Sequence, residues 1–181
     1  RHLAGRALET VGRWVHYPWR SAAVHLLGPD EFHELRTSRN RNKITAEEQD
    51  RLRSLVLGVA GLSVGSSTAL TLVQEGLGRE VRLADFDTLD LSNLNRLRAT
   101  VLDIGVPKAI ITARAIAELD PYVKVRIFSE GVTDTTIHPF LEGLDLLFEE
   151  CDGLAMKLQL REEARRLRIP VLMETSDRGM I

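Results

Sequence analysis

The feature that most constrains the fold is an alternation of short aliphatic runs with longer amphipathic segments, which extends from about residue 55 to residue 173. Aliphatic runs of this length are typical of strands that a parallel sheet buries on both faces, and the segments between them are long enough to form helices. Strands that are joined through helices form right-handed crossovers. The sequence therefore predicts an α/β fold, with a doubly wound, mainly parallel sheet and helices on both faces.

Turn and capping signals place the boundaries of these elements. The expected strands cover residues 55–60, 80–84, 123–128, 144–148 and 170–173. The expected helices cover residues 65–75, 108–119 and 154–167. Before the first strand, Thr45 followed by Glu48 predicts a capping box at the start of a further helix.

The composition supports this fold class and narrows the range of partners. Hydrophobic residues make up 44% of the chain and aromatic residues only 5%, which favours an aliphatic core. The chain has 24 Lys and Arg against 26 Asp and Glu, so neither nucleic acid nor a membrane is expected as a partner. A single cysteine, Cys151, excludes an internal disulfide and a CxxC zinc pair, and it favours a cytoplasmic location.

The residues that follow each expected strand are the first candidates for a site, because Rossmann-like sheets bind ligands beyond the carboxyl ends of their strands. Gly61 and Gly65 follow the first strand and lead into a helix whose free amides can face a phosphate, although their spacing does not fit GxGxxG. Asp85 follows the second strand, at the distance expected of an acid that accepts ribose hydroxyls. Taken alone, these segments could also be a tight turn without a ligand and an Asx-rich loop that caps its own backbone.

The continuation of the acidic segment resembles a known family. The run DFDTLDLSNLNR at residues 85–96 closely resembles DxDxVxxSNLNRQ of the ThiF, MoeB, HesA and ubiquitin-activating family. RTSRN at 36–40 is similar to the family's RYSRQ, the stretch 105–108 to GxxK, and FEECD at 148–152 to DCTDN. The resemblance runs from about residue 36 to 173 and implies ATP-dependent adenylation of a carboxylate, with release of pyrophosphate.

The resemblance implies a role for each matched residue. Asp85 would hold the ribose, Asp152 would hold Mg²⁺, and Arg39 would reach the phosphates bound by the other subunit of a homodimer. The other contacts to ATP would come from Gly61, Gly65, Asp87, Asn93, Arg96 and Lys108. Of the whole set, Arg39, Arg96, Lys108 and Asp152 would be catalytic, because cations and a metal offset the repulsion between a carboxylate and a triphosphate.

Several positions depart from the family pattern. The family's GxGGxG reads AGLSVG at residues 60–65, and Leu62 is expected to resist a positive φ and to narrow the nucleotide loop. Leu97 and Gly153 replace the glutamine and the asparagine that follow the matched motifs. The chain shows neither CxxC pairs nor a second cysteine, and we expect Cys151 to be an unreactive thiol at a strand end.

The resemblance also implies partners. The carboxylate would belong to a ubiquitin-like carrier protein or a peptide. The segments ADFDTLDLSNLNR, EECDG and METSDRG are similar to those of a subgroup in which a nitroreductase-like domain is attached. Two other functions stay open from the sequence: an oxidoreductase that binds NAD or FAD through Asp85, and a non-catalytic member of the family.

Two domains are expected. Residues 1–35 contain apolar residues that Pro18 and a turn at 28–30 interrupt, which predicts an N-terminal helical extension. Residues 36–181 would form the nucleotide-binding adenylation domain. Because the chain begins at Arg1 and ends at Ile181 after a polar turn, we expect a piece of a longer protein whose adenylation domain is truncated on its C-terminal side.

Overall fold

The computed structural model describes residues 5–173, and most of the METSDRG segment lies outside this range. The chain divides into two compact units, Arg1–Arg51 and Leu52–Ile181. This division by packing falls after Arg51, and the predicted boundary between residues 1–35 and an adenylation domain of residues 36–181 stays a prediction. Contacts across residue 36 place the following segment in the first unit, because Arg41 donates to Glu34 at 3.1 Å and the Thr37 amide donates to the His33 carbonyl at 2.9 Å.

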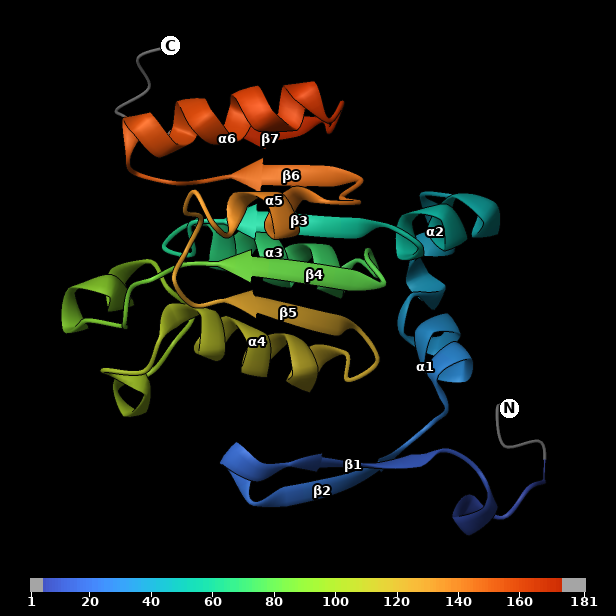
Figure 1. The fold of residues 1–181 in the computed structure, drawn as a ribbon. Coiled ribbons are helices and arrows are strands. Elements are labelled where there is room, and N and C mark those ends of the chain that lie inside the picture. Colours follow the sequence, from blue (N-terminus) through green and yellow to red (C-terminus); the bar gives the residue numbers. More distant parts are fainter. Residues whose placement is uncertain (1–4, 174–181) are drawn as a thin grey trace. The chain divides into compact units, whose positions relative to one another are not determined.

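The first unit contains a β-hairpin where helices were predicted, so that expectation is wrong for residues 13–26. Strand β1 (Arg13–Tyr17) pairs antiparallel with β2 (Ala22–Leu26) across the short 3-10 turn η2 (Pro18–Arg20) (Figure 1). Aromatic and β-branched residues favour strands, and the ring of Trp14 packs on His25 of the opposite strand with centroids 5.1 Å apart. Pro18 and the positive φ of Ser21 close the turn.

Helices complete the first unit. They are the 3-10 helices η1 (Leu8–Thr10) and η3 (Ser38–Asn42) and the α-helices α1 (Pro29–Arg36) and α2 (Ala46–Arg53), of which α2 ends two residues beyond the unit's boundary at Arg51. The predicted capping box at the start of α2 is present, because the Thr45 amide donates to Glu48 at 2.8 Å and the Glu48 amide donates to Thr45 at 3.2 Å.

The second unit is built on a five-stranded parallel sheet, which confirms the predicted fold class. Its strands are β3 (Val56–Ala60), β4 (Glu80–Ala84), β5 (Lys124–Phe128), β6 (Leu146–Glu149) and β7 (Val171–Met173). Their order across the sheet is β5-β4-β3-β6-β7, and every neighbouring pair is parallel. The chain builds outward from β3 first through β4 and then through β6, so the switch point of the topology lies beside β3.

Helices cover both faces of this sheet (Figure 1). On one face, α3 (Gly65–Gln74) and α4 (Lys108–Leu119) pack on Val59, Val81 and Phe148. On the other, α5 (Ile137–Leu141) and α6 (Leu154–Arg166) pack on Val56, Ala84 and Leu147. The short 3-10 helices η4 (Leu91–Asn95) and η5 (Val101–Asp103) lie between β4 and α4 in the chain. The single turn of α5 was not predicted, because five residues that include Pro139 show no helical period.

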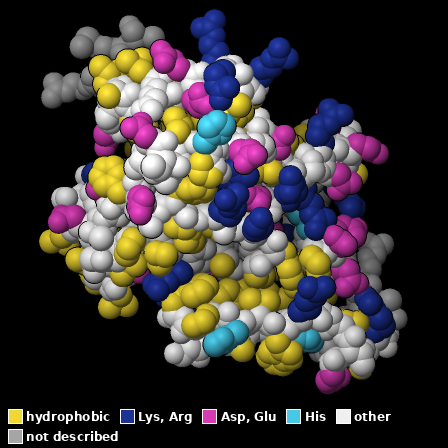
Figure 2. Space-filling view, in the orientation of Figure 1, with side chains coloured by type: hydrophobic (Ala, Val, Ile, Leu, Met, Phe, Trp, Pro, Cys, Tyr) yellow, Lys and Arg dark blue, Asp and Glu magenta, His cyan; other side chains and the backbone are white. Residues whose placement is uncertain are grey.

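No helix within residues 5–173 is both long enough and apolar enough to cross a membrane. On the face shown in Figure 2, acidic and basic side chains are interspersed and neither sign forms a continuous field. This distribution agrees with the near balance of 24 Lys and Arg against 26 Asp and Glu.

A buried charge network holds the amino-terminal edge of the sheet. The carboxylate of Glu80 accepts from Arg82 at 2.9 Å and from Lys124 of the neighbouring strand at 2.9 Å. Arg82 also donates to three carbonyls around the end of α5, those of Pro139, Phe140 and Glu142. Burial alone would raise the pKa of Glu80, but the hydrogen bonds and charges of Lys124 and Arg82 outweigh it and lower that pKa.

This network makes a prediction about acid stability. A carboxyl group whose pKa is lowered by folding stabilises the folded state above its unfolded pKa, about 4.3, and loses that contribution as the pH falls. We expect Glu80→Gln to lower the free energy of unfolding at pH 7, with a difference from wild type that narrows below about pH 4.3. Urea denaturation at several pH values measures the difference in unfolding free energy between the two proteins. A difference that widens on acidification would contradict a lowered pKa of Glu80.

Candidate functional site

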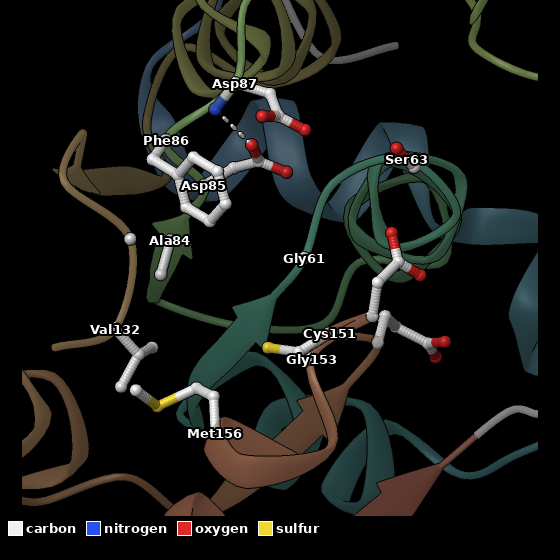
Figure 3. A pocket seen from close by; sticks show the side chains of 13 residues that line it. Gly61, Ser63, Ala84, Asp85, Phe86, Asp87, Val132, Cys151, Gly153 and Met156 are labelled. Carbon is white, nitrogen blue, oxygen red and sulfur yellow. Dashed lines mark hydrogen bonds between the residues drawn. The ribbon is translucent and has the colours of Figure 1, made fainter.

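A cavity of about 230 Å³ lies beyond the carboxyl ends of β3, β4 and β6, at the edge where the sequence predicts a site (Figure 3). Its lining residues are Gly61, Ser63, Ala84, Asp85, Phe86, Asp87, Gly131, Val132, Glu150, Cys151, Asp152, Gly153 and Met156. Segments that are far apart in the sequence thus contribute to one concave surface. Gly61, Asp85, Asp87 and Asp152 of the predicted set lie together in it.

Gly61 allows the turn after β3 to approach the turn after β6. Its φ is +87°, and a Cβ at this position would lie 2.4 Å from the carbonyl oxygen of Glu150. Gly65 serves packing instead, because a Cβ there would lie 2.7 Å from Val59 of β3. Both glycines are therefore required by close approach, and only Gly61 lines the cavity.

Leu62 does not narrow the loop as predicted. It is absent from the residues with positive φ, its side chain is fully buried, and it packs in the core beneath α3 and α4. The positive φ of this turn is at Gly61, so Leu62 keeps a negative φ and its side chain can point into the core.

Asp85 joins two loops of the cavity through its carboxylate. One oxygen accepts the amide of Leu62 at 2.6 Å, and the other accepts the amide of Asp87 at 2.7 Å (Figure 3). The residue is 8% exposed, so the two hydrogen bonds compensate for most of its lost hydration. Each carboxylate oxygen can accept a second hydrogen bond, which leaves capacity for a ligand hydroxyl.

Lys108 lies at the first position of α4 and bridges the same two loops. Its ammonium donates to Asp87 at 2.7 Å and to Ser63 at 3.1 Å. Only 4% of its side chain is exposed, whereas half of the Asp87 side chain is. Lys108 thus places a positive charge behind two residues that line the cavity, although it does not itself line it.

The cavity has an apolar side and a polar side (Figure 3). Phe86, Val132 and Met156 lie on one side, and Ser63 lies on the other, beyond Gly61. Phe86 is 77% exposed and its ring lies next to Gly131, where a Cβ would be 3.0 Å from Cδ1 of Phe86. Sequence reasoning missed Phe86, whose only signal is an aromatic residue between two acids.

The predicted residues Asn93 and Arg96 do not line the cavity. Asn93 is buried, and its side-chain oxygen accepts the amide of Asp90 at 3.0 Å, while Asp90 accepts the amide of Ser92 at 2.9 Å. The reading of this stretch as a loop that caps its own backbone thus holds for Asp90 and Asn93. Arg96 is exposed and donates to Asn95 at 2.9 Å.

Two further predicted residues differ in how they are held. Asp152 is exposed at the cavity and makes no hydrogen bond or ion pair with any residue in the described range 5–173, so its carboxylate is available to a cation. Arg39 is exposed in the first unit, and its contact with a phosphate stays a prediction.

Cys151 lies between Glu150 and Asp152 in the chain. Burial raises the pKa of its thiol to about 12, and the neighbouring Glu149 carboxylate adds to the effect. A thiol with such a pKa holds almost no thiolate near neutral pH, which agrees with the expectation of an unreactive group.

Comparison with known proteins identifies relatives of this chain. The sequence model of the ThiF family matches residues 37–176. An uncharacterized protein of Mycobacterium tuberculosis is 51% identical over 174 residues, which are 96% of this chain and 24% of that protein. A tRNA threonylcarbamoyladenosine dehydratase of Bacillus subtilis is 32% identical over 75% of this chain and 54% of its own length. The chain thus spans a quarter of the first relative and about half of the second.

A solved structure shares the fold. The tRNA N6-threonylcarbamoyladenosine dehydratase of Escherichia coli, solved in complex with ATP, superposes with a TM-score of 0.76 at 24% identity. The match covers 82% of this chain and 62% of that one. At this identity the likeness supports the fold.

The geometry at Gly61 makes a prediction with a matched control. Gly61→Ala combines a positive φ with a backbone clash, whereas Gly143→Ala has φ +71° and nothing within 4 Å of its Cβ. We expect Gly143→Ala to cost about 1–2 kcal/mol of unfolding free energy and Gly61→Ala at least about 3 kcal/mol. Urea denaturation measures both, and equal losses would show that the approach to Glu150 is not tight.

Proposed function

The chain belongs to the ThiF family, and from this premise we propose that it binds ATP and carries the nucleotide-binding half of an enzyme that adenylates a carboxylate and releases pyrophosphate. The observation that supports this proposal most is the order of groups in the cavity. An apolar side, a carboxylate with spare acceptor capacity and a buried ammonium follow one another, as a base, a ribose and a phosphate chain do in ATP.

In this proposal each part of ATP meets matching chemistry. The adenine lies at Phe86, Val132 and Met156, since a planar base stacks on an exposed aromatic ring. The ribose hydroxyls donate to Asp85. The phosphates lie at the turn after Gly61, where Lys108 is already held by Ser63 and Asp87.

A magnesium ion fits the acidic side of the cavity. Mg²⁺ is commonly held by one or two carboxylates together with substrate phosphates and water. Asp152 is exposed and unpaired among the described residues, which makes it the proposed protein ligand. The ion would neutralise phosphate charge and favour pyrophosphate as the leaving group.

The residues of this chain would act by binding and orientation. Attack of a carboxylate on the α-phosphorus brings two anions together, so the barrier is largely electrostatic. Lys108 would supply positive charge from behind the cavity, Arg96 would supply it from outside the cavity lining, and Arg39 would supply it across a homodimer. Positioning of the two reactants supplies a further part of the rate, because little covalent chemistry is left to the protein.

The proposed substrate is the carboxylate of a ubiquitin-like carrier protein or of a peptide. A nitroreductase-like domain attached to this one is part of the same proposal. The relative from Bacillus subtilis is named for a tRNA nucleoside, so a carboxylate carried by tRNA is the alternative that a substrate panel must include.

Pyrophosphate exchange in the whole protein, with a panel of carboxylates, tests the activity. We expect Asp152→Asn and Arg96→Ala each to lower exchange by about 10²–10³-fold, as the loss of one group that stabilises transition-state charge does. Arg98→Ala is the matched control for Arg96, since Arg98 is also exposed and lies two residues away. Full exchange in both test variants would reject the site, and nucleotide binding without exchange on any carboxylate would favour a non-catalytic member.

A comparison of ligands separates adenylation from a dinucleotide-dependent oxidoreductase. A ligand that binds only the folded state at a hundred times its Kd adds about 2.7 kcal/mol of stability, which raises the melting temperature by several degrees. We expect ATP with Mg²⁺ to give this rise and NAD to give little or none. A larger rise with NAD than with ATP would favour the oxidoreductase.

A further inference from the structure

A fully buried carboxylate lies directly beneath the acidic side of the cavity. Glu149 is the last residue of β6 and has 0% of its surface exposed. It lines no part of the cavity, and the matched family motif gave it no role. A buried carboxylate without partners is strongly destabilising, so the groups that surround it define what it does.

The two oxygens of Glu149 bind different parts of the structure. One accepts the amide of Cys151 at 2.8 Å, inside the turn that follows β6. The other accepts two donors of Arg161 on α6, Nε at 2.9 Å and Nη2 at 2.6 Å. Lys157, one helical turn before Arg161, lies 3.5 Å from the first oxygen. Glu149 therefore ties the turn to the inner side of α6.

The same turn is held from its other side by β3. The amide of Glu150 donates to the carbonyl of Ala60 at 2.8 Å, and the Glu150 carbonyl lies against Gly61. The segment 150–152 is thus fixed between the glycine turn and α6. Asp152 follows directly after the amide that Glu149 holds, and its own side chain has no partner within residues 5–173 to orient it.

We propose that Glu149 is a positioning residue that holds the turn carrying Asp152, so that the Asp152 carboxylate meets the metal of the bound nucleotide. This inference rests on the proposed function of the cavity. Groups that orient a metal ligand change metal affinity or activity by about 10–100-fold when they are removed. A residue needed only for folding would lower stability without a selective effect on the metal.

The test compares two buried carboxylates of the same sheet. Glu149→Gln keeps an oxygen for the Cys151 amide and removes the charge that Arg161 and Lys157 balance. Glu80→Gln is the matched control, because Glu80 is also buried and charge-paired but lies on β4, which β3 separates from β6, and at the opposite edge of the sheet. Arg161→Gln removes the two guanidinium hydrogen bonds that helix α6 donates to Glu149.

Two quantities are measured in the whole protein: the Mg²⁺ concentration for half-maximal pyrophosphate exchange at saturating ATP, and the Kd of AMP with EDTA present. We expect Glu149→Gln and Arg161→Gln to raise the Mg²⁺ requirement about 10–100-fold. The AMP Kd should stay within about twofold of wild type, because base and ribose contacts lie elsewhere in the cavity. Glu80→Gln should leave both quantities unchanged.

The outcomes separate this inference from the function on which it rests. A wild-type protein without nucleotide binding or Mg²⁺-dependent exchange would refute the proposed function. An active wild type with an unchanged Mg²⁺ requirement in Arg161→Gln would overturn the role of Glu149. Equal shifts in Glu149→Gln and Glu80→Gln would overturn it as well. If Glu149→Gln does not fold, Arg161→Gln decides the question, because a third of the Arg161 side chain is exposed and helix α6 tolerates its loss more readily.

Discussion

The site depends on the hydrogen bonds that the Asp85 carboxylate accepts. Its hydrogen bonds to the amides of Leu62 and Asp87 join the turn after β3 to the loop after β4. This junction is possible only because Gly61 turns with positive φ, which also brings the turn after β6 into contact. The cavity is therefore a consequence of backbone geometry at the switch point of the sheet, and its side chains are placed by that geometry.

Buried ion pairs have different structural roles at the amino-terminal and carboxyl-terminal edges of the sheet. Glu80 balances Arg82 and Lys124 and so joins β4 to β5, and Arg82 also donates to a carbonyl at the end of α5. Glu149 uses a similar pairing at the carboxyl edge to hold a turn that lines the cavity. Two ion pairs of similar burial can thus differ in consequence, because one stabilises packing and the other fixes backbone that lines the cavity.

The five strands were predicted well from the sequence, because aliphatic runs of this length have few other interpretations. The predicted bounds of helix 108–119 agree with those of α4. The hairpin at residues 13–26 was missed because its aromatic residues fit a helix period as well as a strand period. In the site, Asp85 was predicted from its place after a strand and Asp87 from the family resemblance. The hydrogen bond from Lys108 to Ser63 joins residues 45 positions apart, so no local pattern predicts it. Glu149 did leave a signal: an acid closes the run LLFE, and Lys157 and Arg161 follow at helical spacing.

The charge of the cavity supports the proposal that a cation binds together with the nucleotide. Asp85, Asp87, Glu150 and Asp152 all line it, and Lys108 is the buried cation behind them, already paired with Asp87. A triphosphate alone would add negative charge to an acidic surface, and at short range in a partly dry site that repulsion is large. Under the proposed function, a metal ion bound to ATP would offset this repulsion and would give Asp152 an attractive partner. The acidic lining would then favour metal-bound nucleotide over free nucleotide.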